Sequence, residues 1–333
     1  MATIYDVSVL AGVSLATVSR VMNNNPKVSD KTRQKVLDAM QSLGYKPNTI
    51  AQSLASNCSN SVGVLVSQLD GPFYGPMMTQ IETSLRAANK HVIIAAGHSD
   101  EAQEKDSVDF LKGRGCDALI LDVEAVSDDY LIKLSKGDTP IVLINRYVEA
   151  IKDRCVFLKN ERGGHMATEH ILSLGHKDIA YISGPMFKLD ARDRLRGHQR
   201  ALAEHNVLFE PDIWYEGNYK EDGGVAAMEH LLSLNKPFTA VVCANDQMAS
   251  GAISVCLDRG LKVPEDISFI GYDNIPFPTY ITPKLDTVSN PIDEMGRMAA
   301  LWVLQQVYKD DKVSVNSCFV PELFIRNSSM KKT

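Results

Sequence analysis

Four apolar runs of this sequence are each followed, after a short interval, by side chains that can hydrogen-bond a small polar molecule. Amides, carboxylates and arginine form paired hydrogen bonds with the vicinal hydroxyls of a sugar, while an aromatic ring packs against its C–H face. Any one of these residues could instead be a turn former or a helix cap. Because the pattern repeats after four runs, it predicts a ligand site. The candidate residues are Asp70, Phe73, Tyr74, Asn145, Arg146, Asn245 and Asp273.

Motifs of catalysis and metal binding are missing from the sequence. It contains no GxSxG nucleophile elbow, no GxxxxGK[ST] phosphate loop and no clustered His/Cys spacing. His165 and His170 are five residues apart, which is poor spacing for two ligands on one helix face. We therefore expect no enzyme, no metal site and no cofactor.

The elements that would position the candidate residues alternate regularly from residue 62 onward. Strands are expected at 62–66, 92–96, 118–121, 141–144, 179–182, 240–243 and 267–270. Helices are expected at 74–88, 101–112, 127–134, 164–174, 190–205, 223–234 and 246–259, and a last helix at 293–308 precedes a last strand at 317–323. This alternation indicates an α/β fold of two doubly wound parallel sheets, with ligand at the carboxyl ends of the strands.

The N-terminal residues show a different pattern, with two short helices joined by a tight turn. The first helix, at 4–11, can begin with a capping pair made by Thr3 and Asp6. Its inward side would carry Val7, Leu10 and Ala11.

Gly12 allows the turn, and Ser14 can cap the second helix. That helix would bury Val18 and Val21 and expose Leu15, Ala16, Ser19 and Arg20. This is the pattern of a helix-turn-helix, whose second helix enters the DNA major groove. An ordinary helical hairpin would show the same periodicity.

A third helix would complete a small core. It is capped by Ser29 and ends at Gly44, a residue that helix C-termini favour. Its core residues would be Leu37, Met40 and Leu43.

The motifs AGVSLATVSRVMN, VSDKTRQKV and GYKPNTIAQSL together resemble the N-terminus of the lactose-repressor (LacI) family. The opening segment MATIYDVSVLAGVSLATVSRVMNN and the segments LINR and FTAV resemble the galactose repressor group within that family. The resemblance implies a DNA-binding head at 1–46, a hinge helix and linker at 47–60, and a periplasmic-binding-protein-like core at 61–333. Its first lobe would hold about 61–158 and 290–318, and its second lobe about 159–289 and 319–330.

The resemblance also implies which residues contact DNA. In the head they would be Thr3, Tyr5, Ser14, Leu15, Ala16, Thr17, Ser19, Arg20 and Asn23. In the hinge they would be Asn48, Ala51, Leu54 and Ala55. The hinge is too short to be a stable helix alone, and it would fold when two copies meet on DNA, where Leu54 wedges into the minor groove.

For the effector site the resemblance adds Arg194, at the family's effector-binding arginine, and supports the aromatic pair, Asn245 and Asp273. The sequence departs from the family pattern at Leu158-Lys159-Asn160, where Val-x-x-Asp-Asn is common. No ligand contact is therefore assigned to Lys159.

Charge and cysteine content agree with a regulator of this kind. Residues 1–57 hold six basic and three acidic residues, a net charge of +3. The remainder holds 29 basic and 38 acidic residues, a net charge of −9. A basic head on an acidic body suits contact with DNA phosphates at one end only. Six scattered cysteines without a CxxC pair, no signal segment and no membrane-length apolar run indicate a cytoplasmic protein.

We therefore expect a homodimeric transcriptional repressor that binds a two-fold symmetric operator under allosteric control by a small sugar such as galactose. The C-terminus lacks the leucine heptads that would favour a tetramer. A nucleoside- or purine-responsive regulator of the same family remains an alternative. A periplasmic sugar carrier, the other alternative, does not fit the basic head or the missing signal segment.

Overall fold

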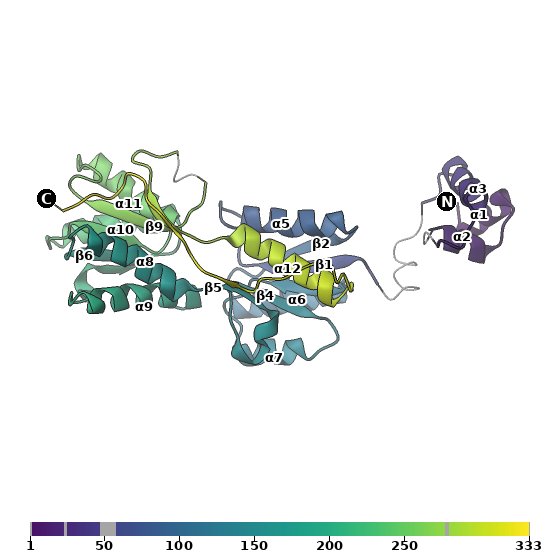
Figure 1. Cartoon of the computed structure of the whole chain (residues 1–333), viewed down its shortest axis with the longest axis horizontal. Helices are drawn as coiled ribbons and strands as arrows, with labels where there is room; N and C mark the ends of the chain where they lie inside the picture. The colour runs from purple at the N-terminus through teal and green to yellow at the C-terminus, as the bar shows by residue number, and fades with distance from the viewer. Residues whose placement is uncertain (1, 23–24, 47–57, 277–279, 333) are drawn as a thin grey trace. The chain divides into compact units, whose positions relative to one another are not determined.

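The computed structural model describes residues 2–22, 25–46, 58–276 and 280–332. Internal contacts divide the chain into two units, Met1–Asn60 and Ser61–Thr333 (Figure 1). Five of the residues expected to contact DNA, Asn23, Asn48, Ala51, Leu54 and Ala55, lie outside the described residues.

The first unit contains three helices: α1 (Ile4–Ala11), α2 (Leu15–Met22) and α3 (Asp30–Ser42). The expected capping box opens α1, because Thr3 Oγ1 accepts the Asp6 amide and the Asp6 carboxylate accepts the Thr3 amide. Gly12 ends this helix at a φ of 64°, a conformation that costs glycine little. Local capping and turn chemistry therefore set the boundaries of the pair α1 and α2.

The core of the first unit is formed by Val7, Val18, Val21, Val36 and Ala39, all nearly inaccessible. The predictions for Leu10 and Leu37 were wrong, because these side chains are 55% and 45% exposed. Successive residues on a helix are about 100° apart, so a residue next to the buried stripe already faces outward.

The second unit is built on two six-stranded sheets. The first sheet has the strand order β11-β5-β4-β3-β1-β2 and every neighbouring pair is parallel. Its strands are β1 (Ser61–Val66), β2 (His91–Ala96), β3 (Ala118–Leu121), β4 (Ile141–Ile144), β5 (Cys155–Leu158) and β11 (Cys318–Phe319). With it belong α5 (Tyr74–Ala87), α6 (Glu101–Gly113), α7 (Asp128–Ser135) and α12 (Ile292–Gln306). We call this group the first lobe.

The second sheet has the order β12-β10-β9-β8-β6-β7. Its strands are β6 (Ile179–Ser183), β7 (Trp214–Glu216), β8 (Ala240–Cys243), β9 (Ser268–Asp273), β10 (Asp286–Ser289) and β12 (Leu323–Phe324). They pair in parallel except β12, which runs antiparallel to β10. The helices α8 (Asn160–Ser173), α9 (Leu189–Glu204), α10 (Glu221–Ser233) and α11 (Asp246–Asp258) complete the second lobe.

The chain passes between the lobes three times, after β5, after β10 and between β11 and β12. After the second passage α12 packs beside α5, where a Cβ on Gly296 would lie 2.7 Å from the Met77 carbonyl oxygen (Figure 1). The two sheets are therefore joined by three connecting segments of the chain.

Most expected elements are present, but the last strand is not a single element. The segment 317–323 was predicted as one strand, whereas the structure has β11 in the first sheet and β12 in the second. Pro321 lies between them and has no amide hydrogen for a ladder, which favours a break at this point. The short strands β5, β7 and β10 were not predicted. Two of them lack the apolar run that marks a buried strand, because β10 carries buried polar residues and β7 is an edge strand of three residues.

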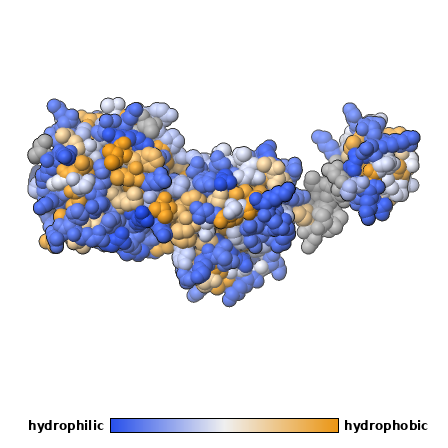
Figure 2. Space-filling model, viewed as in Figure 1, coloured by the Kyte–Doolittle hydropathy of each residue, from blue (hydrophilic) through white to orange (hydrophobic). Residues whose placement is uncertain are grey.

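Four cysteines, Cys116, Cys155, Cys243 and Cys256, are buried free thiols. Among the described residues no single helix is long and apolar enough to cross a membrane, and only α1 and α2 taken together, bent by 104°, reach that length. Hydrophilic side chains cover most of the visible face of the second unit, with hydrophobic ones in smaller patches (Figure 2).

Candidate functional site

The outer face of α2 carries the exposed side chains that the sequence assigned to DNA. Leu15 is 44% exposed, and Ala16, Ser19 and Arg20 are exposed as well. Ser14 Oγ accepts the Thr17 amide at 3.2 Å, as expected for the cap of this helix. Buried Val18 and Val21 hold the opposite face on the core, so the N-terminal turn of α2 presents its side chains outward.

The remaining predicted contacts of the first unit also lie on or near its surface. Tyr5 is 64% exposed. Thr3 is exposed and Thr17 is partly buried, and their hydroxyls bond to Asp6 and Ser14 within the head.

In the second unit a cavity of about 230 Å³ lies where the carboxyl ends of strands from both sheets meet. The structure brings seven of the eight predicted effector residues to its wall. These are Asp70, Phe73, Tyr74, Asn145, Arg194, Asn245 and Asp273.

Arg146 is the predicted residue that does not line this cavity. Its guanidinium lies 2.7 Å from Asp128 Oδ1 and 3.4 Å from the Val123 carbonyl oxygen, at a neighbouring depression. Asn145 and Arg146 are adjacent after β4, and the ion pair with Asp128 on α7 draws only the arginine away.

Arg194, on α9, is the most tightly held side chain at the cavity. Its Nε donates to Asn160 Oδ1 at 3.0 Å and its Nη1 to the Ala244 carbonyl oxygen at 2.6 Å. Nη1 also lies 3.2 Å from Asp273 Oδ1, and the guanidinium stacks 3.7 Å above the Tyr272 ring. Although burial opposes its charge, Asp273 and other acidic neighbours raise the pKa of Arg194. The arginine is therefore permanently charged and fixed in place.

Asp273 ends β9 with a φ of 99°, an uncommon backbone conformation for a residue with a side chain. Its carboxylate is held by Arg194 and by Asn290 Nδ2 at 3.3 Å. Burial raises its pKa and the Arg194 charge opposes that rise. Asp273 and Arg194 thus form one buried ion pair at the cavity wall.

Asn245 lines the cavity, but both ends of its amide are engaged by the protein. Its Oδ1 accepts the Met248 amide at 3.0 Å, which makes it the cap of α11, and its Nδ2 donates to the Tyr219 carbonyl oxygen at 2.8 Å. The next residue, Asp246, is fully buried and accepts from the Thr287 hydroxyl and from the Ile275 amide. Asn245 therefore shapes the wall by holding the loop of Tyr219.

Asn145, unlike Asn245, leaves part of its side-chain amide without a protein partner among the described residues. It follows β4 at a φ of 60°, and its buried Oδ1 has no hydrogen-bond partner among the described residues. A buried acceptor without a partner costs free energy that a bound hydroxyl would recover. Asn145 is thus the wall residue best prepared to accept a hydrogen bond from a ligand.

The cavity wall also contains residues that were not predicted from the sequence, among them Glu124, Lys188, Asp190 and Tyr219. Lys188 Nζ lies 2.6 Å from Glu124 Oε2, and the Tyr219 hydroxyl donates to Asp190 at 3.0 Å. Glu124 comes three residues after β3, in the same position as the predicted residues after other strands, and that signal could have found it. Lys188, Asp190 and Tyr219 follow no such rule, because they lie at or just before helix starts.

Asp122, a buried acidic neighbour of Glu124, is held toward its neutral form. Burial and the neighbouring Glu124 raise the pKa of Asp122 to about 8, and burial raises the pKa of Glu124 against the opposing effect of Lys188. Asn160, in the segment that departs from the family pattern, supports Arg194 and Tyr272 from behind.

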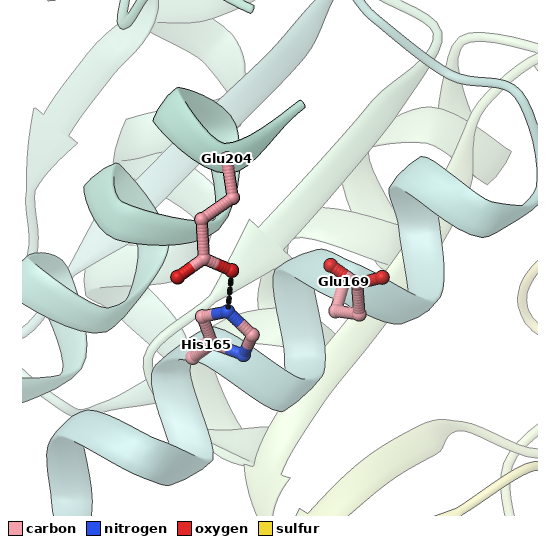
Figure 3. Close-up of side chains that lie close together, drawn as sticks. All are labelled: His165, Glu169 and Glu204. Carbon is pink, nitrogen blue, oxygen red and sulfur yellow. Dashed lines mark hydrogen bonds and ion pairs between the residues drawn. The ribbon is translucent and has the colours of Figure 1, made fainter. Parts of the chain in front are cut away.

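A second polar cluster lies between α8 and α9, away from the cavity lining. His165 Nε2 lies 2.7 Å from Glu204 Oε2, and Glu169 lies close by (Figure 3). His205 Nε2 lies 2.8 Å from Glu169 Oε2. The sequence spacing relates His165 to His170, whereas the structure places His165 beside Glu169 and Glu204, and the ligand atoms of these three residues lie within 4.8 Å of one another. These contacts tie the two helices together.

Comparison with known proteins agrees with both units. Residues 3–48 match the family described as "Bacterial regulatory proteins, lacI family", and residues 168–329 match "Periplasmic binding protein-like domain". The chain is 38% identical to the HTH-type transcriptional regulator GalR of Escherichia coli K12, over 98% of this chain and 96% of that protein. It is 33% identical to the HTH-type transcriptional repressor PurR of Mannheimia succiniciproducens, over 99% of each.

A solved structure gives the same result for the fold. The Lac repressor dimer bound to operator and the anti-inducer ONPF matches with a TM-score of 0.88 at 29% identity, over 99% of each chain. Its likeness extends over the head and both lobes. The chain therefore belongs to the lacI family of bacterial regulatory proteins and is a DNA-binding transcriptional repressor, not an enzyme.

Proposed function

We propose that this repressor controls sugar-utilisation genes and that a small sugar such as galactose is its effector. The observation that supports this most directly is the cavity wall, where carboxylates, aromatic rings and an amide oxygen without a partner among the described residues surround a small volume. Such a wall offers both donors and acceptors to vicinal hydroxyls and a ring face to C–H groups. The similarity to GalR supports galactose as the first sugar to test.

We further propose the division of labour expected from the sequence, with a head at 1–46, a hinge at 47–60 and a core at 61–333. The chain would act in the cytoplasm as a homodimer on a two-fold symmetric operator, as the operator-bound Lac repressor dimer suggests. Ligand would favour one arrangement of the two lobes, and that preference would change operator affinity.

A nucleobase or nucleoside is the second candidate effector. The identity to PurR, 33%, is close to the identity to GalR, and the same cavity could hold a flat ring against Phe73 or Tyr219. The paired carboxylates of the wall suit hydroxyls better than they suit an aromatic base.

Calorimetric titration of the full chain with D-galactose and with hypoxanthine tests the proposal. We expect D-galactose to bind and Asp273→Asn to weaken that binding by roughly five- to 150-fold, because about 1–3 kcal/mol is lost when a buried hydrogen-bonding group loses its partner. The variant should still bind operator. Saturable binding of hypoxanthine without binding of D-galactose would contradict the sugar assignment, and unchanged affinity in Asp273→Asn would remove this residue from the site.

A further inference from the structure

The ion pair between Glu124 and Lys188 joins the two lobes at the wall of the cavity. Glu124 follows β3 of the first lobe and Lys188 precedes α9 of the second. Nζ and Oε2 are 2.6 Å apart, and the side chains are only 13% and 11% exposed. A contact this short between two lobes depends directly on how closely the lobes approach.

The position of Glu124 is set by the first lobe itself. Its loop is held by the buried carboxylate of Glu104 on α6, which accepts the backbone amides of Glu124, Ala125 and Val126 at 2.9–3.1 Å. Ser99 Oγ also donates to Glu124 Oε2 at 2.6 Å. The carboxylate is therefore presented to the cavity by a rigid frame that does not require Lys188.

Each cation that lines the cavity already has an acidic partner. Lys188 pairs with Glu124, Arg194 with Asp273 at 3.2 Å, and Lys220 with Asp70 at 3.6 Å. The described lining residues comprise three cations and five carboxylates, a net formal charge of −2. The two remaining carboxylates, Asp190 and Glu221, accept hydrogen bonds from Tyr219 and Gln247.

This charge balance selects between classes of ligand. A phosphate group would enter a cavity with excess negative charge and would find no cation free of an acidic partner among the described lining residues. An uncharged ligand with several hydroxyls could donate to Glu124 and accept from Lys188 without breaking their pairing, and it could donate to Asn145 Oδ1.

We propose that Glu124 and Lys188 bind the same hydroxyl-bearing edge of an uncharged sugar from opposite lobes, and that this pair excludes phosphorylated sugars. The inference rests on the proposed sugar-responsive function and narrows it to unphosphorylated effectors. It also makes the pair a specificity element, because an uncharged ligand bridges the lobes there while an anion would compete with Glu124 for Lys188.

The test is calorimetric titration of the full chain with D-galactose, D-glucose and D-ribose, and with the 6-phosphates of the two hexoses and ribose 5-phosphate. We expect the best neutral sugar to bind at least tenfold more tightly than its phosphate ester. If a phosphate ester binds more tightly than its neutral sugar, the present inference is wrong and a sugar effector survives. If none of the six binds, the proposed sugar-responsive function fails as well.

Glu124→Gln isolates the role of the pair. The substitution keeps the shape of the side chain and removes the acidic partner of Lys188. We therefore expect the affinity of the protein for the neutral sugar to fall, and its preference for the neutral sugar over the phosphate ester to shrink by at least tenfold. Lys188→Gln should weaken binding of the neutral sugar without allowing the phosphate ester to bind. Glu229→Gln, with the same change of charge on the exposed surface of α10, is the matched control and should leave both affinities unchanged. An unchanged preference in Glu124→Gln, in protein that still unfolds cooperatively on heating, would overturn the role of the pair.

Discussion

His198, on α9, is a buried imidazole whose protonation is coupled to the stability of the second lobe. The Thr168 hydroxyl donates to the Gly164 carbonyl oxygen and lies 2.8 Å from His198 Nδ1, so Nδ1 is the protonated ring nitrogen. The ring stacks on Tyr181 with centroids 4.4 Å apart, and Nε2 has no partner among the described residues. Burial lowers the pKa of His198 to about 3, so the folded protein holds this ring neutral.

This lowered pKa predicts a loss of stability in acid. Below the unfolded-state pKa of about 6.5 the unfolded chain binds a proton that the folded chain does not, so stability falls as pH decreases from 6.5 toward 3. His198→Phe keeps a ring and removes the titration. Between pH 7.5 and 5, we expect the variant to lose about 2 kcal/mol less unfolding free energy than the parent. Calorimetric unfolding of both proteins at each pH measures the difference, and parallel pH profiles would contradict the assignment.

At the scale of elements, the crossing of α8 and α9 links packing to the effector cavity. A Cβ on Gly197 would lie 2.1 Å from the Glu161 carbonyl oxygen, and one on Gly164 would lie 2.1 Å from the Arg194 carbonyl oxygen. Two glycines thus let the backbones touch, and this contact places Arg194 at the cavity. The sequence shows the glycines, but only the crossing shows why a side chain is excluded.

Gly197→Ala should therefore separate the helices, destabilise the core by about 1–3 kcal/mol and weaken effector binding through displacement of Arg194. Gly113→Ala, at the end of α6 with open space around the position, should change stability by less than about 1 kcal/mol. Thermal unfolding and D-galactose titration of both variants test the link. If Gly197→Ala were destabilised while effector affinity stayed the same, the crossing would not position the arginine.

The exposed N-terminal turn of α2 leads to a prediction about DNA. Leu15 and Ala16 are apolar, so they can contact thymine methyl groups but cannot form the bidentate hydrogen bonds that arginine or glutamine makes with purines. Substituting both should change the preferred operator bases and leave the salt dependence of binding nearly unchanged. Lys35→Ala removes an exposed charge from α3. If Lys35 contacts phosphate, this change should reduce the salt dependence of binding and leave the preferred bases unchanged. Binding-site selection at two salt concentrations separates these outcomes, and an unaltered base preference would mean that α2 is not the reading helix.

At the scale of the whole molecule, regulation requires that the lobes and the DNA-binding heads communicate. The chain passes between the two sheets three times, and the Glu124–Lys188 pair joins the lobes at the cavity wall, so we expect the arrangement of the lobes to depend on what occupies the cavity. The segment 47–60 connects this core to the head along the chain. Its apolar residue Leu54 is the one for which the sequence suggests insertion between DNA base pairs.

Leu54→Ala should weaken specific operator binding far more than non-specific binding and remove most of the DNA bend. Unstacking a base step costs a few kcal/mol, which the bent duplex offsets through closer contact only if the wedge is present. Effector affinity should not change, because the cavity lining lies in residues 61–333. Gel-mobility bending assays measure the effect, and a fully bent operator in the variant would show that this segment is only a tether.

The sequence by itself determined the features that depend on local chemistry. The capping box of Thr3 and Asp6, the turn at Gly12 and the alternation of strands and helices follow from residues close together in the chain. Side chains that follow parallel strands lie at the carboxyl-end edge of their sheet, and ligands bind in the crevice at such edges. Asp70 and Asn145 of the first sheet and Asn245 and Asp273 of the second could therefore be expected at one site.

Tertiary structure alone decided which of those side chains remain available to a ligand. Asn145 and Asn245 follow strands in the same way. Asn145 Oδ1 has no partner among the described residues, whereas the amide of Asn245 is hydrogen-bonded to the backbone of Met248 and Tyr219. Arg146 turns to Asp128, while Lys188 meets Glu124 from the other lobe. These outcomes depend on distances between elements remote in the sequence, and periodicity and capping rules contain no information about such distances.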